Sequence, residues 1–106
     1  MTSSESKLQV EFEHLVRIGD CDRVSHFLDE HWQDVDIDGY TADESKSQTP
    51  LQMACLNSNL RLAKVLVRFG ANWRLASKDG FSLLHIAAFS GNSELLNYVM
   101  SLGSCD

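Results

Sequence analysis

Residues 49–55 read TPLQMAC, and further along the chain residues 82–88 read SLLHIAA. A second pair recurs at the same offset, because VLVRFGAN at residues 65–72 returns as YVMSLGSC at residues 98–105. Since both blocks share one offset, the period covers a whole structural unit and not only one short motif. A fixed period between about 20 and 50 residues is the sequence signature of a repeat architecture.

A period of about 33 residues around a Thr-Pro-Leu-His-x-Ala core is typical of ankyrin repeats. We therefore predict an all-α ankyrin-repeat solenoid of three helix-turn-helix units with hairpin fingers. The domain should cover residues 8–106, after a flexible N-terminal tail at residues 1–7. Repeats of this kind stack on their neighbours, and their extended surface commonly binds another protein. The expected units are about 8–40, 45–77 and 78–106.

The second and third units carry clear helix signals. Pro50 suits the first turn of an inner helix over residues 50–56, because its missing N–H has no intrahelical partner there. A turn at residues 57–59 follows, and apolar residues at helical spacing predict an outer helix that Gly70 closes. The third unit should repeat this scheme, with an inner helix at 83–89, a turn at 90–92 and an outer helix at 93–102.

The first unit is degenerate. Its apolar spacing predicts an inner helix through residues 8–16, a turn at residues 19–20 and an outer helix within residues 21–31. The step along the sequence from the turn at Gly19 to the turn at Ser58 is longer than the step from Ser58 to Gly91. The extra residues must fall after the outer helix, so we expect a long finger over residues 32–48.

Composition excludes several classes of function. Residues 1–44 hold twelve acidic and three basic side chains, and residues 45–106 hold three acidic and six basic ones. The net charge of −6 argues against direct nucleic-acid binding beyond marginal backbone contact. No apolar run approaches the roughly 18–20 residues of a membrane span. The three cysteines, Cys21, Cys55 and Cys105, form no C-x-x-C pair, which favours reduced thiols in a nuclear or cytoplasmic protein.

One motif suggests a metal. Asp34, Asp36, Asp38 and Gly39 match the first half of a calcium-binding loop of the EF-hand type. The second half fails, because Ser45 stands where a bidentate glutamate is required. A calcium-responsive switch therefore remains only an alternative, and we expect no metal.

Catalytic signatures are missing from the sequence. It contains no glycine-rich phosphate loop, nucleophile elbow or His-Glu-x-x-His helix. His85 occupies the position of the repeat's own histidine, where an imidazole typically braces the hairpin backbone, and Cys55 should be a small packed residue. We expect no enzymatic activity, no cofactor and no small-molecule substrate.

Binding surface is the remaining candidate for function. Finger tips and exposed inner-helix positions line the concave face of such a stack, and large exposed aromatic side chains there mark contact sites. Trp73, in the preceding finger, either joins the third unit's aromatic residues or packs against neighbouring fingers. No capping unit follows the third repeat, so its last face, with Ala88, Leu96 and Met100, either tolerates exposure or docks a partner. The concave positions of the third unit are Lys78, Asp79, Phe81, Phe89 and Ser90.

Residues 68–89, RFGANWRLASKDGFSLLHIAAF, resemble the Notch-regulated ankyrin repeat protein family. The Arg-Leu-Ala run and the final phenylalanine are features that ordinary ankyrin repeats do not require. The resemblance implies a negative feedback regulator of Notch signalling and of transcription. Such a protein would bind the ankyrin domain of the Notch intracellular fragment together with the DNA-binding protein CSL, prolonging the Notch ankyrin stack.

The resemblance also implies partner contacts at Phe81 and Ala88. An adaptor for another target, in phosphatase or kinase regulation, is the alternative among binding modules. The complete predicted partner-binding set is Trp73, Arg74, Lys78, Asp79, Phe81, Ala88, Phe89 and Ser90.

Overall fold

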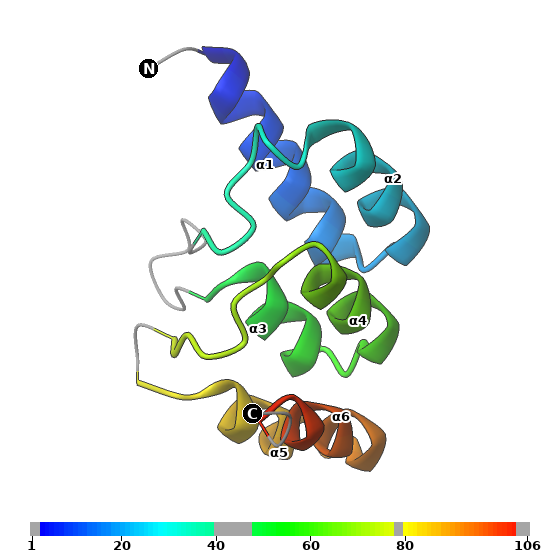
Figure 1. The fold of residues 1–106 in the computed structure, drawn as a ribbon, viewed down its shortest axis with the longest axis vertical. Helices are drawn as coiled ribbons and strands as arrows, with labels where there is room; N and C mark the ends of the chain where they lie inside the picture. The colour runs from blue at the N-terminus through cyan, green and yellow to red at the C-terminus, as the bar shows by residue number, and fades with distance from the viewer. Residues whose placement is uncertain (1–2, 40–47, 78–79, 104–106) are drawn as a thin grey trace.

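A computed structural model describes residues 3–39, 48–77 and 80–103. This part of the chain forms six helices and no strand. Figure 1 shows them as three helix pairs stacked in layers, with the segments after α2 and α4 on the same side of the stack. The arrangement confirms the predicted all-α solenoid. The helices are α1 (Ser3–Ile18), α2 (Cys21–His31), α3 (Pro50–Leu56), α4 (Leu60–Arg68), α5 (Leu83–Ser90) and α6 (Ser93–Gly103).

Capping residues fix where the inner helices begin. Thr49 caps α3 by accepting a hydrogen bond from the Gln52 backbone N–H, and the Gln52 side chain accepts one from the Thr49 backbone N–H in return. Pro50 takes the first helical position, as predicted. Ser82 caps α5 in the equivalent way, by accepting from the backbone N–H of His85.

The turns between paired helices share one backbone conformation. Gly19, Ser58 and Gly91 follow the three inner helices, with φ angles of +84°, +60° and +77°. This left-handed region suits glycine, because a Cβ atom crowds the following carbonyl oxygen there. Ser58 is the one non-glycine residue with positive φ in the described chain. The shared conformation aligns the first unit with the other two, by matching Gly19 to Ser58 and Ser58 to Gly91.

The core runs continuously through the stack. Helix α3 packs against α1 on one side and α5 on the other, while α2 packs against α4. Because each unit buries its apolar face on the next, no unit has a core of its own. The largest fully buried apolar side chains are Phe12, Val16, Val24, Leu28, Leu51, Leu62, Leu66 and Leu95.

The N-terminal segment differs from expectation. Residues 1–7 were predicted to be a frayed tail, but α1 begins at Ser3. The prediction was wrong for residues 3–7, because no glycine or proline interrupts this stretch and the helix continues through it. Within the described chain, no helix is both long enough and apolar enough to cross a membrane.

The long finger is described only in part. Residues 32–39 lie beside α1, where the Gln9 amide donates to the carbonyl oxygen of Asp36 and accepts from its backbone N–H. Asp38 accepts a hydrogen bond of 2.7 Å from the backbone N–H of Asn72, which links this finger to the next one. Residues 40–47 of the predicted finger lie outside the described residues.

Candidate protein-binding site

The second and third units bury equivalent helix positions very differently. Leu51 and Cys55 on α3 are 2% and 0% exposed, because the third unit covers them. Their equivalents one repeat later, Leu84 and Ala88 on α5, are both exposed, Leu84 to 47%. The third unit therefore presents to solvent the surface on which the second unit binds its neighbour. We define this C-terminal face by Leu84, His85, Ala88, Leu96 and Met100.

A shallow pocket opens beside the C-terminal face. Its volume is about 520 Å³, and it lies between Trp73 in the finger, Leu84 on α5 and Met100 on α6. The guanidinium of Arg74 lies 4.9 Å from the centre of the Trp73 ring, a cation–π contact that holds both side chains at the pocket. Trp73 is half-buried and packs against the core, so this part of the face is pre-formed.

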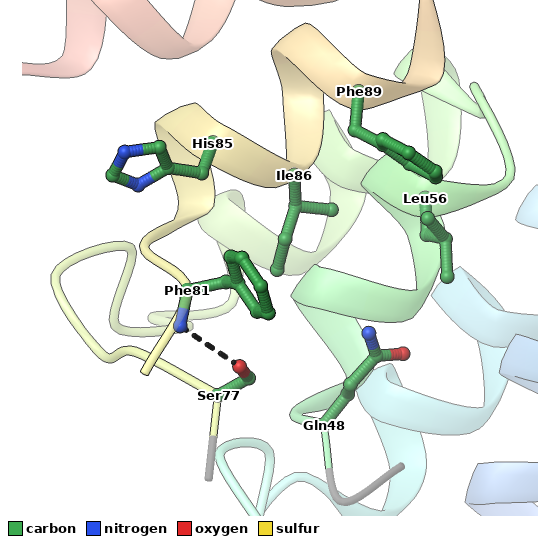
Figure 2. A pocket seen from close by; sticks show the side chains of 7 residues that line it. All are labelled: Gln48, Leu56, Ser77, Phe81, His85, Ile86 and Phe89. Carbon is green, nitrogen blue, oxygen red and sulfur yellow. Dashed lines mark hydrogen bonds between the residues drawn. The ribbon is translucent and has the colours of Figure 1, made fainter. Parts of the chain in front are cut away.

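The two predicted phenylalanines line a second pocket, of about 360 Å³. Figure 2 shows Phe81, from the finger, and Phe89, from α5, near Leu56 of α3. Phe89 is 83% exposed, and no other large apolar side chain in the described chain is more exposed. The Phe81 backbone N–H donates to Ser77 Oγ at 3.2 Å, and Ser77 is buried, so the finger holds Phe81 in place. We call this the aromatic pocket.

The structure separates residues that the sequence left together. Trp73 lies at the C-terminal face pocket and does not join Phe81 and Phe89 at the aromatic pocket. Ser90 is half-buried, and its hydroxyl donates to the Ala87 carbonyl oxygen at 2.6 Å, so it serves the turn. Lys78 and Asp79 lie outside the described residues.

Sequence reasoning overlooked two members of the C-terminal face, Leu84 and His85. Each looks like a consensus ankyrin residue, and consensus positions suggest packing and not contact with a partner. The signal that could have found them is the repeat offset itself, because Leu51 and Gln52 are buried only where another unit follows. Leu56 and Gln48, from the second unit, also line the aromatic pocket.

The opposite end of the stack carries polar residues at the equivalent of buried positions. Glu11 and His14 on α1 stand where α5 has the buried residues Leu83 and Ile86. On α2, Arg23 stands where α6 has the buried Leu95. These polar side chains distinguish this end from the C-terminal face, although Val10, 65% exposed, lies beside Glu11 and His14. We define the N-terminal face by Glu11, His14, Arg23 and His26.

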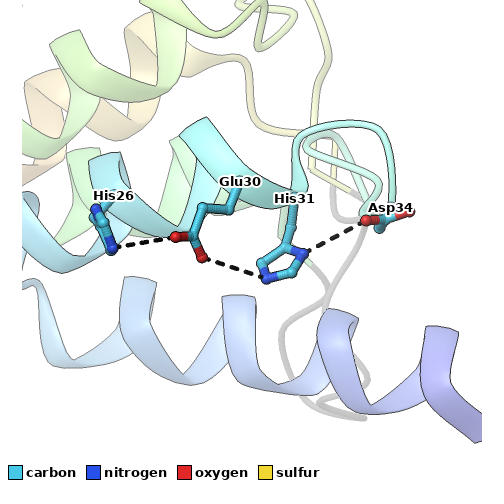
Figure 3. Close-up of polar contacts among 4 residues, drawn as sticks. All are labelled: His26, Glu30, His31 and Asp34. Carbon is cyan, nitrogen blue, oxygen red and sulfur yellow. Dashed lines mark hydrogen bonds and ion pairs between the residues drawn. The ribbon is translucent and has the colours of Figure 1, made fainter.

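Ion-pair contacts extend this polar character along α2 into the finger. Figure 3 shows Glu30 between His26 and His31, with carboxylate-to-ring distances of 3.4 Å and 3.8 Å. The other ring nitrogen of His31 lies 3.5 Å from a carboxylate oxygen of Asp34. Pairs this exposed contribute little stability, but their solvation opposes docking of an apolar partner.

The aspartates of the possible calcium loop contact other groups of the protein. Asp34 contacts His31, Asp36 accepts from the Asp38 backbone N–H at 3.0 Å, and Asp38 accepts from the next finger. Among residues 3–39, 48–77 and 80–103, no group of three or more metal-ligating side chains converges. Residues 40–45, the second half of that loop, lie outside the described residues.

Cys55 is the buried small residue that the sequence predicted. It is fully inaccessible, and burial raises the pKa of its thiol from 9.0 to about 12. A thiol with this pKa is almost wholly protonated at neutral pH and is a poor nucleophile.

Comparison with known proteins settles the class of the stack. A family model described as ankyrin repeats (3 copies) matches residues 13–106. The chain belongs to the ankyrin-repeat family. Ankyrin repeats form protein-interaction surfaces, which agrees with two exposed apolar sites on one domain.

The chain is also similar to individual proteins, and each of these similarities covers only part of the relative's length. The Notch-regulated ankyrin repeat-containing protein of Homo sapiens is 46% identical over 56 residues, covering 53% of this chain and 49% of that protein. Protein B of the same name from Danio rerio is 46% identical over 56 residues, covering 53% of this chain and 50% of that protein. These matches confirm the resemblance identified in the sequence, and the chain spans about half the length of these relatives.

A more distant relative aligns over more of the chain. Protein phosphatase 1 regulatory subunit 27 of Mus musculus is 30% identical over 89 residues, covering 84% of this chain and 54% of that protein.

Proposed function

We propose that this protein is a non-catalytic adaptor that binds the ankyrin domain of the Notch intracellular fragment together with CSL. It acts in the nucleus, the cytoplasm or both, as a negative feedback regulator of Notch-dependent transcription. Catalysis has no part in this role, which requires only a surface complementary to the Notch ankyrin repeats.

The observation that carries the proposal is the C-terminal face. Leu84 and Ala88 repeat the surface that Leu51 and Cys55 use to bind a following ankyrin unit inside this chain. A surface already suited to one ankyrin unit is suited to another, because the same positions and the same helix spacing recur. Burying apolar area there is favourable by roughly 25 cal/mol per Å² before the costs of association.

The aromatic pocket supplies a second contact region on the same unit. Phe81 and Phe89 are large, exposed and near Leu56, and aromatic anchors of this kind often dominate binding energy. The names of the relatives, Notch-regulated ankyrin repeat-containing proteins, favour a partner in the Notch pathway.

Size-exclusion co-elution tests the proposal. The chain is mixed with a purified Notch intracellular ankyrin domain, with and without CSL and its DNA. We expect co-elution in the mixture with CSL and DNA, and its loss in a Phe81→Glu variant that circular dichroism shows to be folded. Absence of co-elution in every mixture, with the wild-type chain folded, would reject Notch as the partner.

A second candidate is an adaptor for protein phosphatase 1. The 89-residue match to a regulatory subunit of that enzyme favours it specifically. The same chromatography with the purified phosphatase catalytic subunit in place of the Notch fragment separates the two. Binding to the phosphatase alone would favour this candidate over Notch.

A further inference from the structure

Three basic side chains lie along the exposed side of α4. Arg61, Lys64 and Arg68 stand at i, i+3 and i+7, a spacing that places them on one face of a helix, and all three are exposed. At 1.5 Å of rise per residue, the line that they form is about 10 Å long. The Nζ atom of Lys64 lies 5.6 Å from the centre of the Tyr98 ring on α6, a cation–π contact that restrains the lysine. We call Arg61, Lys64 and Arg68 the basic strip.

The basic strip is a property of α4 and not of the repeat. Figure 1 shows α4 between α2 and α6 in the stack. The aligned turns that precede these helices identify the equivalent positions on α2 and α6, and none of them carries a positive charge. The strip is therefore bounded on both sides by acidic or uncharged side chains. The equivalents are Asp22, Ser25 and Asp29 on α2, and Glu94, Asn97 and Ser101 on α6.

The charges of the basic strip are not neutralised by the protein around them. Among residues 3–39, 48–77 and 80–103, no carboxylate lies within ion-pair distance of Arg61, Lys64 or Arg68. Three positive charges on one line, with acidic side chains to either side, produce a local potential opposite in sign to that of the whole chain. Such a surface attracts an anionic group of matching shape and repels a basic one.

We propose that the basic strip binds an acidic segment of a partner protein that presents carboxylates along one face of a helix. Carboxylates at i, i+4 and i+7 of a helix are separated along its axis by about 6 Å and then about 4.5 Å, which matches the strip in the antiparallel direction. The C-terminal face and the aromatic pocket contain no residue of α4. The inference therefore goes beyond the proposed function, and it does not depend on Notch being the partner.

The acidic side chains beside the strip select a narrow partner. Packed helices lie about 8–10 Å apart, so a partner wider than one helix would approach Asp22, Asp29 and Glu94 as well. A DNA duplex is wider than one helix and carries one negative charge per about 1.7 Å of its axis, so it would place phosphates against these carboxylates. A second copy of this chain would offer the equivalent line on α2, which has only two carboxylates because Ser25 stands between them.

NMR titration of the full, isotope-labelled chain tests the inference, with a helical alanine-based peptide as the probe. The probe peptide carries three glutamates, at i, i+4 and i+7. The strip variant, Arg61→Gln/Arg68→Gln, removes two charges from α4, and the matched control, Arg17→Gln/Arg23→Gln, removes two exposed charges from the first unit. We expect amide shifts concentrated on α4, binding about tenfold weaker in the strip variant, and binding within about twofold of wild type in the control.

Both variants should keep the helix content of wild type in circular dichroism, because glutamine is a good helix former. The absence of shifts on α4 would overturn the inference. Equal weakening in the two variants would also overturn it, because the binding would then follow net charge and not the strip. Tighter binding of a DNA duplex than of the probe peptide at α4 would assign the strip to nucleic acid. Concentration-dependent self-association in light scattering, abolished in the strip variant, would assign it to a second copy, and either result would overturn the inference.

Discussion

The two ends of the stack differ in the polarity of the side chains that they expose on their helices. On the N-terminal face, Glu11 and His14 take positions at which the third unit has the buried Leu83 and Ile86. On the C-terminal face, Leu84 and Ala88 retain apolar residues that the second unit uses for stacking. The apolar C-terminal face is the surface that we propose a partner ankyrin unit covers.

Tryptophan substitutions at Cys55 and Ala88, which are equivalent positions one repeat apart, should show the largest difference in stability. Cys55→Trp must insert a large ring where no space exists, and should lower the free energy of unfolding by about 3 kcal/mol or more. Ala88→Trp adds the same ring to an exposed position and should change it by less than about 0.5 kcal/mol. Urea unfolding followed by circular dichroism measures both, and equal losses would contradict the difference in burial.

Truncating the paired leucines gives a smaller effect in the same direction. Leu51→Ala removes a side chain that is 2% exposed and should cost about 2–3 kcal/mol through lost burial and a cavity. Leu84→Ala, at the equivalent exposed position, should cost about 0.5 kcal/mol. If Leu84→Ala were as costly as Leu51→Ala in urea unfolding, the C-terminal face would be part of the core.

Alkaline pH should distinguish Cys55 from a thiol placed at Ala88. Burial raises the pKa of Cys55 from 9.0 in the unfolded chain to about 12, so above pH 9 the unfolded state releases its proton first. Stability is therefore retained below pH 9 and falls as pH rises toward 12, by at most about 1.4 kcal/mol per pH unit. Urea unfolding at pH 8 and pH 10 should show a steeper fall in wild type than in Cys55→Ala. An Ala88→Cys substitution in the Cys55→Ala background should not restore the steeper fall in stability, because a thiol at position 88 is exposed.

The smallest effect is expected at the turn of the second unit. Ser58→Gly places glycine at φ +60°, matching Gly19 and Gly91, and should raise the free energy of unfolding by about 0.5 kcal/mol. The gain is limited because glycine also adds entropy to the unfolded chain, and because the weak 3.5 Å contact from the Ser58 hydroxyl to Ser90 is lost. Differential scanning calorimetry should show a higher unfolding temperature for Ser58→Gly. A lower unfolding temperature would contradict the claim that the positive φ angle of Ser58 destabilises the native turn.

Local signals predicted the helices well. Pro50 marks the start of α3 and Gly91 the end of α5, and α3 covers residues 50–56 as expected. The start of α1 was missed because residues 3–7 carry no apolar periodicity, although nothing in them stops a helix.

The site was less predictable because it depends on contacts between units. The position of Trp73 follows from the path of its finger, where Asp38 holds the backbone N–H of Asn72, a residue far along the sequence. No local pattern contains that contact. The exposure of Leu84 likewise depends on what covers the face, and its identity matches that of the buried Leu51.

The measurement that most directly tests the central claim compares bulky substitutions at the two ends of the stack. Ala88→Trp obstructs the C-terminal face, and His14→Trp places the same ring on the exposed N-terminal face. In calorimetric titrations with the Notch ankyrin–CSL–DNA complex, Ala88→Trp should weaken binding by about a hundredfold, and His14→Trp should leave it within about twofold. Wild-type affinity in Ala88→Trp, together with lost binding in His14→Trp, would place the docking surface at the opposite end and contradict the account.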